Sequence, residues 1–486
     1  MFSKTPDLIP FTSPLDTGVL SDPEIEALQQ KTIQLLDEVG VKFPSKKALQ
    51  ILADHGAKVD MGREIVQIPP DLVMKAMSTA PRAFILGGRE ERFDLILDGR
   101  CSYLSTDGTG VHVIDLETRE KRASRKEDVA MMAKVVDALP LIGFYWPMVS
   151  AQDYGQTAAL HQCHAGLTNT LKHVRGGTTM HPRLAQYIVE MATVVAGSPE
   201  RLVQRPPICA NICTISPLGH DKEGIESALV YAESGIPVSF MAMPTMGSTA
   251  PAEPLGALVM GDAEVISAMV LMQLAYPGTP VFHAIFTSLI DPRTGRYISE
   301  VPTMSYLLAK QLAHAWKVPC LGGARVSGDA PELGWQSGYE VGLGTALSAI
   351  AGGEICGLLG LVGSAMTLYP EEVILAHDAY LHIHAMLNST NMNEIDNSFE
   401  VIKSVGQRGH YLAQKHTRDR IRGFQISELR DQYEADNQLR DPRKVALERF
   451  KQIEASHRPR PLPGEVLAEL EVILSAAERD AKKLIG

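Results

Sequence analysis

Eight short apolar runs recur through the middle of this chain, and each closes in a cluster of Gly, Ser, Thr, Asp or aromatic residues. Stretches with helical periodicity lie between most of them, so strand and helix alternate eight times. This alternation predicts an α/β fold, a (β/α)8 TIM barrel, in which the chemistry sits on the loops that follow the strands. The runs are 101–110, 141–153, 172–179, 207–219, 236–251, 280–292, 318–329 and 356–366.

Additional chain flanks the predicted barrel on both sides, because the protein has 486 residues and a barrel takes roughly 250–300. Residues 1–98 are predicted to form an N-terminal α+β cap, with helices that begin at Ser21 and Ser45. We assign the catalytic barrel to 99–385 and a C-terminal helical extension to 386–486. Amphipathic terminal helices of this kind pack against a barrel or a neighbouring subunit, so we expect a homo-oligomer.

The composition excludes several classes of protein. Hydrophobic residues make up 45% of the chain and charged residues 21%, as in soluble globular proteins. The net charge of −11 argues against a nucleic acid or an anionic membrane as the main partner. No run reaches the ~18 apolar residues of a membrane span, and the first residues lack the regions of a signal peptide, so we expect a cytoplasmic protein.

Familiar catalytic motifs are absent from the sequence. It contains no phosphate-binding loop, no nucleophile elbow and no H-E-x-x-H motif. His161 and His164 form a lone H-x-x-H pair, and the six cysteines form no C-x-x-C pair, so no metal site is expected. A lyase or aldolase would need a Schiff-base lysine at a strand end. Lys172 only opens its run, and Lys310 falls within a helical stretch.

Aromatic residues are instead concentrated at the predicted strand ends. Any one of them is more often a core residue, but together they suit a quaternary ammonium group, which is attracted to aromatic faces. The set comprises Tyr103, Phe144, Tyr145, Trp146, Phe286, Trp335, Tyr339 and Tyr369.

The segment GGARVSGDAPELGWQSGYE (322–340), together with LLDEVGVKF near the start and ISELRDQYEAD near the end, resembles the trimethylamine methyltransferase family. The similarity covers nearly the whole chain. It implies a corrinoid-dependent methyltransferase with a (β/α)8 barrel, which moves a methyl group from an amine to cob(I)alamin on a separate corrinoid protein. No tightly bound cofactor is then expected on this chain.

One departure from the family changes the expected substrate. The archaeal trimethylamine enzymes place pyrrolysine in this loop, and the equivalent position here is Pro331, which has no electrophilic side chain. Trimethylamine is therefore not the expected substrate. A quaternary amine leaves as a neutral tertiary amine, so its attack by Co(I) needs orientation and desolvation more than acid–base help. The pyrrolysine-free branch of the family resembles glycine betaine methyltransferases, and we predict conversion of glycine betaine to dimethylglycine.

A betaine also carries a carboxylate. Arg325 is the first choice for a charge-assisted contact with it, against a purely structural role, and Lys172, His173 and His283 are weaker candidates. Asp107 either offsets the positive charge of the substrate or makes its turn.

Gln336 and Glu340 lie one helical turn apart, in a Gln-x-Gly-x-Glu pattern that the resemblance associates with this loop. They are the candidate catalytic residues, which would orient the ammonium end or the corrinoid, unless they only anchor the helix. The predicted substrate-binding set is Tyr103, Asp107, Trp146, Phe286, Arg325, Trp335 and Tyr339. Two other interpretations stay open, namely another barrel enzyme of the lyase or aldolase type and a non-catalytic betaine-binding protein.

Overall fold

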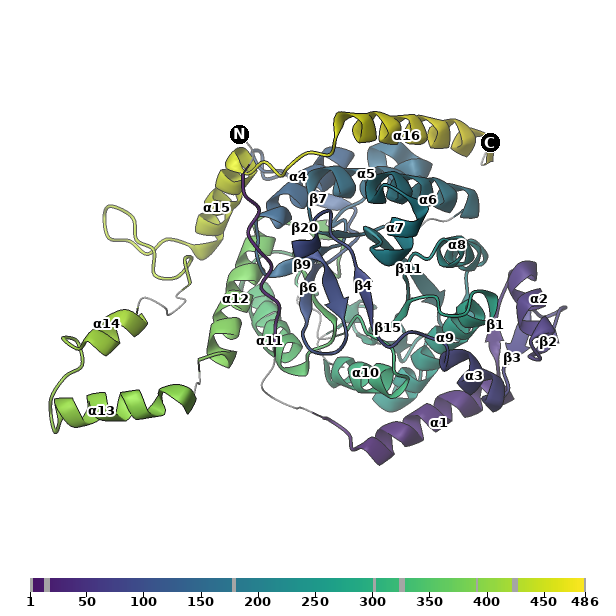
Figure 1. Cartoon of the computed structure of the whole chain (residues 1–486), viewed down its shortest axis with the longest axis horizontal. Coiled ribbons are helices and arrows are strands. Elements are labelled where there is room, and N and C mark those ends of the chain that lie inside the picture. The colour runs from purple at the N-terminus through teal and green to yellow at the C-terminus, as the bar shows by residue number, and fades with distance from the viewer. Residues whose placement is uncertain are drawn as a thin grey trace.

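The computed structural model describes residues 3–12, 18–176, 181–299, 303–322, 328–389, 392–421 and 427–484. They form a mixed α/β fold with parallel strands at its centre and helices around them (Figure 1). Parallel strands need crossover connections, which the intervening helices supply.

Seven strands follow one another in the central sheet in the order β18-β6-β9-β10-β11-β13-β15, each parallel to its neighbour. Each lies in or overlaps one of the apolar runs, which confirms the predicted positions of these strands. Their bounds are β6 Tyr103–Thr106, β9 Ile142–Tyr145, β10 His173–Arg175, β11 Ile208–Ile215, β13 Val238–Ala242, β15 Val281–Ile285 and β18 Ile355–Leu359.

The seventh run behaves differently. Within it only Cys320 and Leu321 pair, through single bridges to His283 of β15 and to Ile355 of β18, and residues 323–327 lie outside the described part of the chain. The strands assigned in the described residues therefore do not by themselves make a closed barrel.

Helices separate consecutive strands, as the periodicity predicts. Their bounds are α4 Lys126–Asp137, α5 Ala158–Asn169, α6 Pro182–Ala196, α7 Pro199–Gln204, α8 Lys222–Glu233, α9 Pro254–Ala275, α10 Thr303–Ala315, α11 Trp335–Ala351 and α12 Glu372–Leu387. Helix α9 is long and apolar enough to cross a membrane, but 83% of its apolar window is buried inside the protein. It is a core helix, whose Asp262 receives hydrogen bonds from Thr32 (2.6 Å) and Trp316 (3.0 Å).

Alternate residues of the strands enter two apolar clusters, because side chains along a strand point to opposite faces. Phe144, Cys209 and Phe282 belong to the cluster on the inner face, and Ile142, Ile208 and Val281 pack beneath the helices. The inner face is covered at the amino ends of the strands by a hairpin of β4 (Phe84–Leu86) and β5 (Leu95–Leu97).

Short strands occur in the segments that connect the main elements. They are β7 His112–Ile114, β8 Lys121–Ala123, β12 Gly219–His220, β14 Thr245–Met246, β16 Ser288–Ile290, β17 Tyr297–Ile298, β19 Leu361–Val362 and β20 Thr367–Leu368.

The N-terminal segment forms helices and short strands. Ser21 caps the first helix through a capping box with Glu24, and the Ser45 hydroxyl accepts a hydrogen bond from the backbone N–H of Ala48 at the second. The elements are α1 Asp22–Glu38, β1 Val41–Lys42, α2 Lys46–Asp54, β2 Lys58–Asp60, β3 Ile65–Gln67 and α3 Pro70–Met77. The strands β1, β3 and β2 extend the central sheet through the pairing of β1 with β12.

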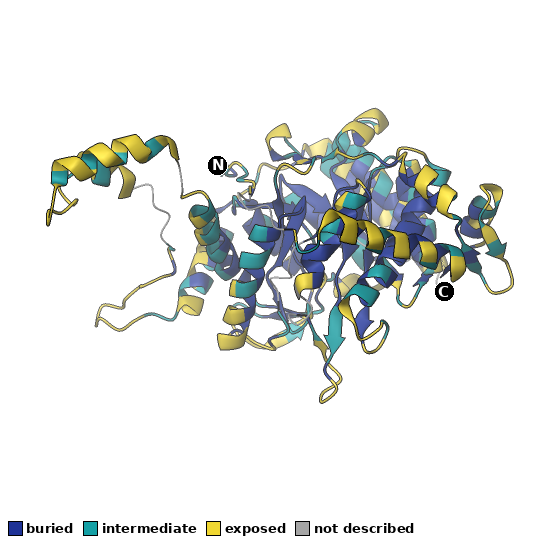
Figure 2. Cartoon of the chain, turned by 90° about the horizontal axis from the view of Figure 1, so that it is seen from below, coloured by how far each residue is buried: buried dark blue, intermediate teal, exposed yellow. Residues whose placement is uncertain are grey.

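The C-terminal segment is helical too, with α13 Ile395–Val405, α14 Lys415–Ile421, α15 Pro442–Ser456 and α16 Gly464–Leu484. Helices α15 and α16 pack against the body of the protein, whereas α13 and α14 project from it and contain no buried residue (Figure 2).

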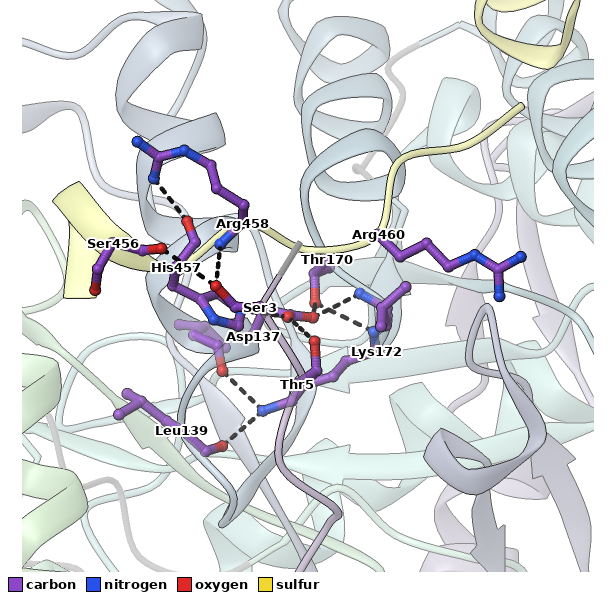
Figure 3. A network of polar contacts seen from close by, with 12 residues as sticks. Ser3, Thr5, Asp137, Leu139, Thr170, Lys172, Ser456, His457, Arg458 and Arg460 are labelled. Carbon is purple, nitrogen blue, oxygen red and sulfur yellow. Dashed lines mark hydrogen bonds and ion pairs between the residues drawn. The ribbon is translucent and has the colours of Figure 1, made fainter. Parts of the chain in front are cut away.

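A buried carboxylate ties both chain ends to the fold. Asp137 accepts hydrogen bonds from Thr5, from Thr170 (2.9 Å) and from the backbone N–H of Leu171 (2.7 Å), and its Oδ2 lies 2.7 Å from Nε2 of His457 (Figure 3). Thr5 and His457 come from opposite ends of the sequence, so this one residue links the N-terminal segment, the centre and the C-terminal segment.

Candidate active site

A cavity of about 300 Å³ opens at the carboxyl ends of the central strands. Its walls come from the loops after β6, β9, β13, β15 and β18, which parallel strands bring to one edge. Its lining includes Asp107, Trp146, Met241, Met243, Phe286, Tyr297, Ser299, Tyr306, Leu358 and Ser364.

Aromatic rings form much of this cavity. Trp146 and Phe286, both predicted from the sequence, line it together, and the Phe286 and Tyr306 rings are 5.7 Å apart at an interplanar angle of 51°. Tyr297 and Tyr306 complete the set. Sequence reasoning missed these two because it examined only aromatics directly after a strand, whereas they follow β15 at a distance, in β17 and α10.

Asp107 lies in the same cavity and is buried. Its backbone N–H donates to the carbonyl of Leu359, and its carboxylate accepts a hydrogen bond from the N–H of Gly108 (2.9 Å). These bonds fix the carboxylate at the strand edge, where it places negative charge among aromatic faces. A small cation is the ligand that this combination favours.

A second, larger cavity of about 720 Å³ adjoins the first. The two share Gly108, Trp146, Met241 and Met243, and the second extends past Asn211 and Cys213 toward residues of η2 (Gln152–Thr157) and of α5. A small bound molecule in the first cavity would therefore have a wider approach beside it.

Arg175 lies beneath Trp146, with its guanidinium carbon 3.6 Å from the centroid of the indole ring. Sequence reasoning considered only Lys172 and His173 in this run. The alternation of side chains along a strand would have pointed to Arg175. It puts Arg175 on the same inner face as His173, whose ring packs on Phe144.

Gln336 and Glu340 lie together, with Gln336 Nε2 donating to Glu340 Oε1 (2.7 Å). Glu340 is buried, and its other oxygen accepts from the backbone N–H of Ala330 (3.0 Å). Neither residue lines the cavity. Gly328 passes so close that a Cβ there would stand 1.5 Å from Glu340 Oε2, so the pair supports the loop behind the cavity wall.

Asp329 in that loop reaches the wall itself. Its carboxylate accepts hydrogen bonds from the backbone N–H of Ser299 (2.5 Å) and from the hydroxyl of Ser364 (2.8 Å), and both serines line the cavity. No sequence signal singled out Asp329, because its partners are 30 and 35 residues away.

Three other predicted residues, Trp335, Tyr339 and Tyr103, do not line the cavity. Trp335 is 84% exposed and stacks on Tyr339, with centroids 5.7 Å apart, because α11 turns Ser337 and Glu340 inward instead. Tyr103 begins β6, so it lies at the amino ends of the strands, where its hydroxyl accepts a hydrogen bond from Ile96 (3.2 Å). Arg325 lies outside the described residues.

The weaker candidates have structural partners. Lys172 Nζ donates to the carbonyls of Val136 (2.7 Å) and Leu139 (2.6 Å), and burial lowers the pKa of its amine to about 7. Lys310 Nζ donates to the carbonyl of Ala351 (2.5 Å). Within the described ranges no lysine lines either cavity. His283 faces the helices, where its Nε2 is 2.7 Å from Asp262.

One group of possible metal ligands occurs in the described part of the chain, made of His314, Cys320 and Glu354, with ligand atoms within 4.8 Å of one another. It lies at the amino end of β18, away from the cavities. Glu354 is already 3.1 Å from His314 Nε2 and accepts from the N–H of Cys320 (2.9 Å), so the fold itself accounts for this cluster. His161, of the H-x-x-H pair, lies 3.0 Å from Glu478 of α16.

A cavity at the carboxyl ends of parallel strands is the usual place for an enzyme's active site, and its aromatic and acidic lining suits a small cationic molecule. Comparison with known proteins is more specific. The family model for trimethylamine methyltransferase (MTTB) matches residues 9–480, and the chain belongs to that family. It is a methyltransferase, and the resemblance noted in the sequence is confirmed.

Similar proteins match over nearly their whole lengths. Trimethylamine methyltransferase MttB of Desulfitobacterium hafniense (strain DSM 10664 / DCB-2) is 30% identical over 94% of this chain and 93% of that protein. A glycine betaine methyltransferase of Desulfitobacterium hafniense (strain Y51) is 26% identical over 94% of this chain and 96% of that protein. The crystal structure of the Methanosarcina barkeri monomethylamine methyltransferase (MtmB) covers 95% of this chain and 92% of its own, with a TM-score of 0.45 and 12% identity.

Proposed function

We propose that this protein transfers a methyl group from a quaternary amine, glycine betaine, to cob(I)alamin on a separate corrinoid protein and releases dimethylglycine. The observation that carries this proposal is the cavity that Trp146, Phe286, Tyr306 and Asp107 line together, in a chain of the trimethylamine methyltransferase family.

The side chains that line the cavity suit a quaternary ammonium group. Aromatic faces attract such a cation, and the Asp107 carboxylate adds a group of opposite charge. The described lining of the first cavity has no lysine, histidine or cysteine that would act as a nucleophile or a base. Because a quaternary amine needs neither, the task of the site is to orient the methyl group and exclude water.

The wider second cavity fits the approach of a corrinoid held by a partner protein. It is open to solvent and meets the first cavity at Trp146 and Met243. When present, the corrinoid supplies a Co(I) nucleophile for the methyl group. On this chain, Asp107 and the aromatic rings hold the ammonium end, and Asp329 holds the serine wall through Ser299 and Ser364.

For Gln336 and Glu340 we propose a positioning role, in which they support the 328–334 loop. Glu340 holds the N–H of Ala330, and the carbonyl of Ala330 accepts from the N–H of Gly363, next to the lining residue Ser364. These two residues would therefore position the wall that faces the substrate.

The architecture is proposed to be a closed (β/α)8 barrel, because the bridges of Cys320 and Leu321 span the gap between β15 and β18. We propose that this barrel occupies 99–385, with the cap at 1–98 and the helical extension at 386–486, and that the protein acts in the cytoplasm.

The proposed homo-oligomer has a candidate contact in the projecting helices α13 and α14. Ile395, Phe399 and Ile402 are exposed at helical spacing on α13, and an apolar stripe of this kind is suited to a second copy of the chain. Light scattering after size exclusion should give a smaller mass for Phe399→Asp than for wild type. An equal mass would show that α13 does not form the contact between copies of the chain.

A spectroscopic assay tests the function. The purified chain is mixed with a reduced corrinoid protein and with glycine betaine, trimethylamine or tetramethylammonium, and the loss of Co(I) absorbance is followed. Glycine betaine should give methylcobalamin and dimethylglycine. If trimethylamine reacts and no betaine does, the substrate assignment is wrong. If betaine binds but no methyl transfer occurs with an active corrinoid protein, the chain is a betaine-binding protein instead.

A further inference from the structure

Arg175, the last residue of β10, is fully buried, and its side chain has no hydrogen-bond partner among the described residues. Its Nε, Nη1 and Nη2 atoms are all unsatisfied. A guanidinium carries five N–H donors and almost never stays buried without an acceptor, because it forfeits its hydration. A group left in this state calls for an explanation in terms of a missing partner.

Among the described residues, no hydrogen-bond acceptor or close ion pair neutralises this charge. Burial lowers the pKa of Arg175 to about 10, which still leaves it cationic at neutral pH. Burial also raises the pKa of the neighbouring Cys209 thiol to about 12, so that thiol is neutral. Asp107 acts on Arg175 at longer range and already accepts a hydrogen bond from Gly108.

The guanidinium lies directly behind the wall of the proposed site. It stacks on Trp146, which lines both cavities, and it is close enough to Cys213 of the second cavity for the two to interact electrostatically. One face of the Trp146 ring is therefore already used by a cation. The ammonium group of a ligand is better placed against Phe286 and Tyr306, at the other side of the first cavity.

We propose that Arg175 binds the carboxylate of the substrate, and that the site therefore takes zwitterions with a quaternary ammonium at one end and a carboxylate at the other. This inference rests on the proposed function and deepens it. A carboxylate can accept two parallel N–H···O bonds from a guanidinium. The carboxylate enters beside Trp146, whose indole ring moves aside, while Phe286, Tyr306 and Asp107 hold the ammonium end.

Two ligands of matched charge at nitrogen test this assignment. Glycine betaine has the carboxylate and tetramethylammonium lacks it, and calorimetry measures the binding of both to the full chain without any corrinoid protein. Arg175→Met should weaken the binding of glycine betaine by about 10- to 100-fold, the ratio expected for charge-assisted hydrogen bonds. It should leave the binding of tetramethylammonium within about twofold. Arg175→Lys keeps the charge without the planar fork and should fall between.

Arg100→Met is the matched control, because it removes an arginine whose side chain is 86% exposed and pairs with Asp98 at the surface. Its affinity for both ligands should equal that of wild type. Thermal unfolding shows whether the Arg175 variants fold, and Arg175→Lys serves as the test if Arg175→Met does not.

Each outcome decides the question. An equal loss for both ligands shows that Arg175 supports the fold of the site, and unchanged affinity for glycine betaine shows that it does not bind the carboxylate. Either result overturns the proposal, as does a wild-type chain that binds tetramethylammonium but not glycine betaine. If glycine betaine binds through Arg175 but no methyl transfer to Co(I) follows, the proposed function fails and the carboxylate site stands.

Discussion

Lys172 and Arg175 are two buried basic residues three positions apart, and their surroundings differ. Lys172 lies next to Asp137 and donates to two backbone carbonyls at the end of α4, those of Val136 in the helix and Leu139 just after it. Arg175 lies at the carboxyl end of β10 with no acceptor in the described part of the chain. The contacts of Lys172 and Asp137 form a complete polar network, whereas the guanidinium at the cavity end of the strand has no partner among the described residues.

The difference indicates which side of the strand serves the fold and which serves a ligand. Around Asp137 each acceptor is used, by Thr5, Thr170, Leu171 and His457, and these contacts join remote parts of the chain (Figure 3). A satisfied buried network makes one structure rigid. A cation that the fold leaves unsatisfied is available to an anion that arrives later.

The largest expected effect comes from breaking the complete network. Asp137→Asn leaves Lys172 without its counter-charge and weakens the contact with His457, so the free energy of unfolding should fall by about 3–5 kcal/mol. Urea unfolding measures it. Asp98→Asn is the control and should change stability by less than about 0.5 kcal/mol, because it alters only local contacts with the side chain and backbone N–H of the exposed Arg100. A loss below about 1 kcal/mol for Asp137→Asn would show that the network does not hold the chain ends.

The same carboxylate should make stability depend on acid pH. Burial by itself raises the pKa of Asp137, but the hydrogen bond with His457 and the charge of Lys172 outweigh it and hold the pKa below its usual value. Its contribution is therefore present above about pH 4, the ordinary range of an aspartate, and is lost as pH falls through the lower folded value. The stability difference between wild type and Asp137→Asn should shrink in that range. A difference that is constant down to pH 2 would contradict this assignment.

Glu372 extends the comparison to a buried acid that can lose its charge by binding a proton. Burial, with Glu371 and Glu340 nearby, raises the pKa of Glu372 to about 8. Its contribution to stability is present below the ordinary pKa of a glutamate, about 4.3, and is lost as pH rises through 8. Glu372→Gln should therefore gain stability over wild type between pH 5 and pH 9, by on the order of a few kcal/mol. Thermal unfolding across that range measures the gain.

Glu117→Gln is the matched control for that series, because it breaks only an exposed ion pair with Lys451 and Glu117 is not among the charges that shift the pKa of Glu372. It should change stability by less than about 0.5 kcal/mol, and equally at each of these pH values. Parallel curves for wild type and Glu372→Gln would show that Glu372 is ionised in the folded protein.

A smaller effect is expected from removing the unsatisfied cation. Arg175→Met replaces a buried charge without a partner by an apolar side chain of similar length, so the free energy of unfolding should rise by about 1–2 kcal/mol. Lys172→Met, which takes a cation from the complete network, should lower it instead. If urea unfolding shows that both variants lose the same free energy of unfolding, the two ends of the strand do not differ in the way proposed.

The smallest effect is expected at Trp335, which the sequence places in the substrate cage. Because its side chain is exposed on α11 and stacks only on Tyr339, Trp335→Ala should change stability by less than about 0.5 kcal/mol. The KM for the amine should stay within twofold in the Co(I) assay. A tenfold increase in that KM would show that Trp335 contributes to substrate binding.

Much of the site could be predicted where local pattern decides position. Asp107, Trp146 and Phe286 each follow a strand that its apolar run identifies, and parallel strands bring such residues to one edge. The pattern is less reliable within helices and at strand starts. Trp335 and Tyr339 point outward because Ser337, Glu340 and Val341 form the buried face of α11, and Tyr103 opens β6 instead of closing it.

The sequence by itself determined the alternation of strands and helices, the family and a set of aromatic strand ends, because each depends on residues close together in the chain. Only the tertiary structure decided which polar groups are paired. Asp137 meets partners from residue 5 to residue 457, and Arg175 meets none in the described part of the chain, although both residues belong to the same α4–β10 region. Pairing depends on distances across the fold, which local spacing does not encode, and here it separates a charge that holds the protein together from one left for a ligand.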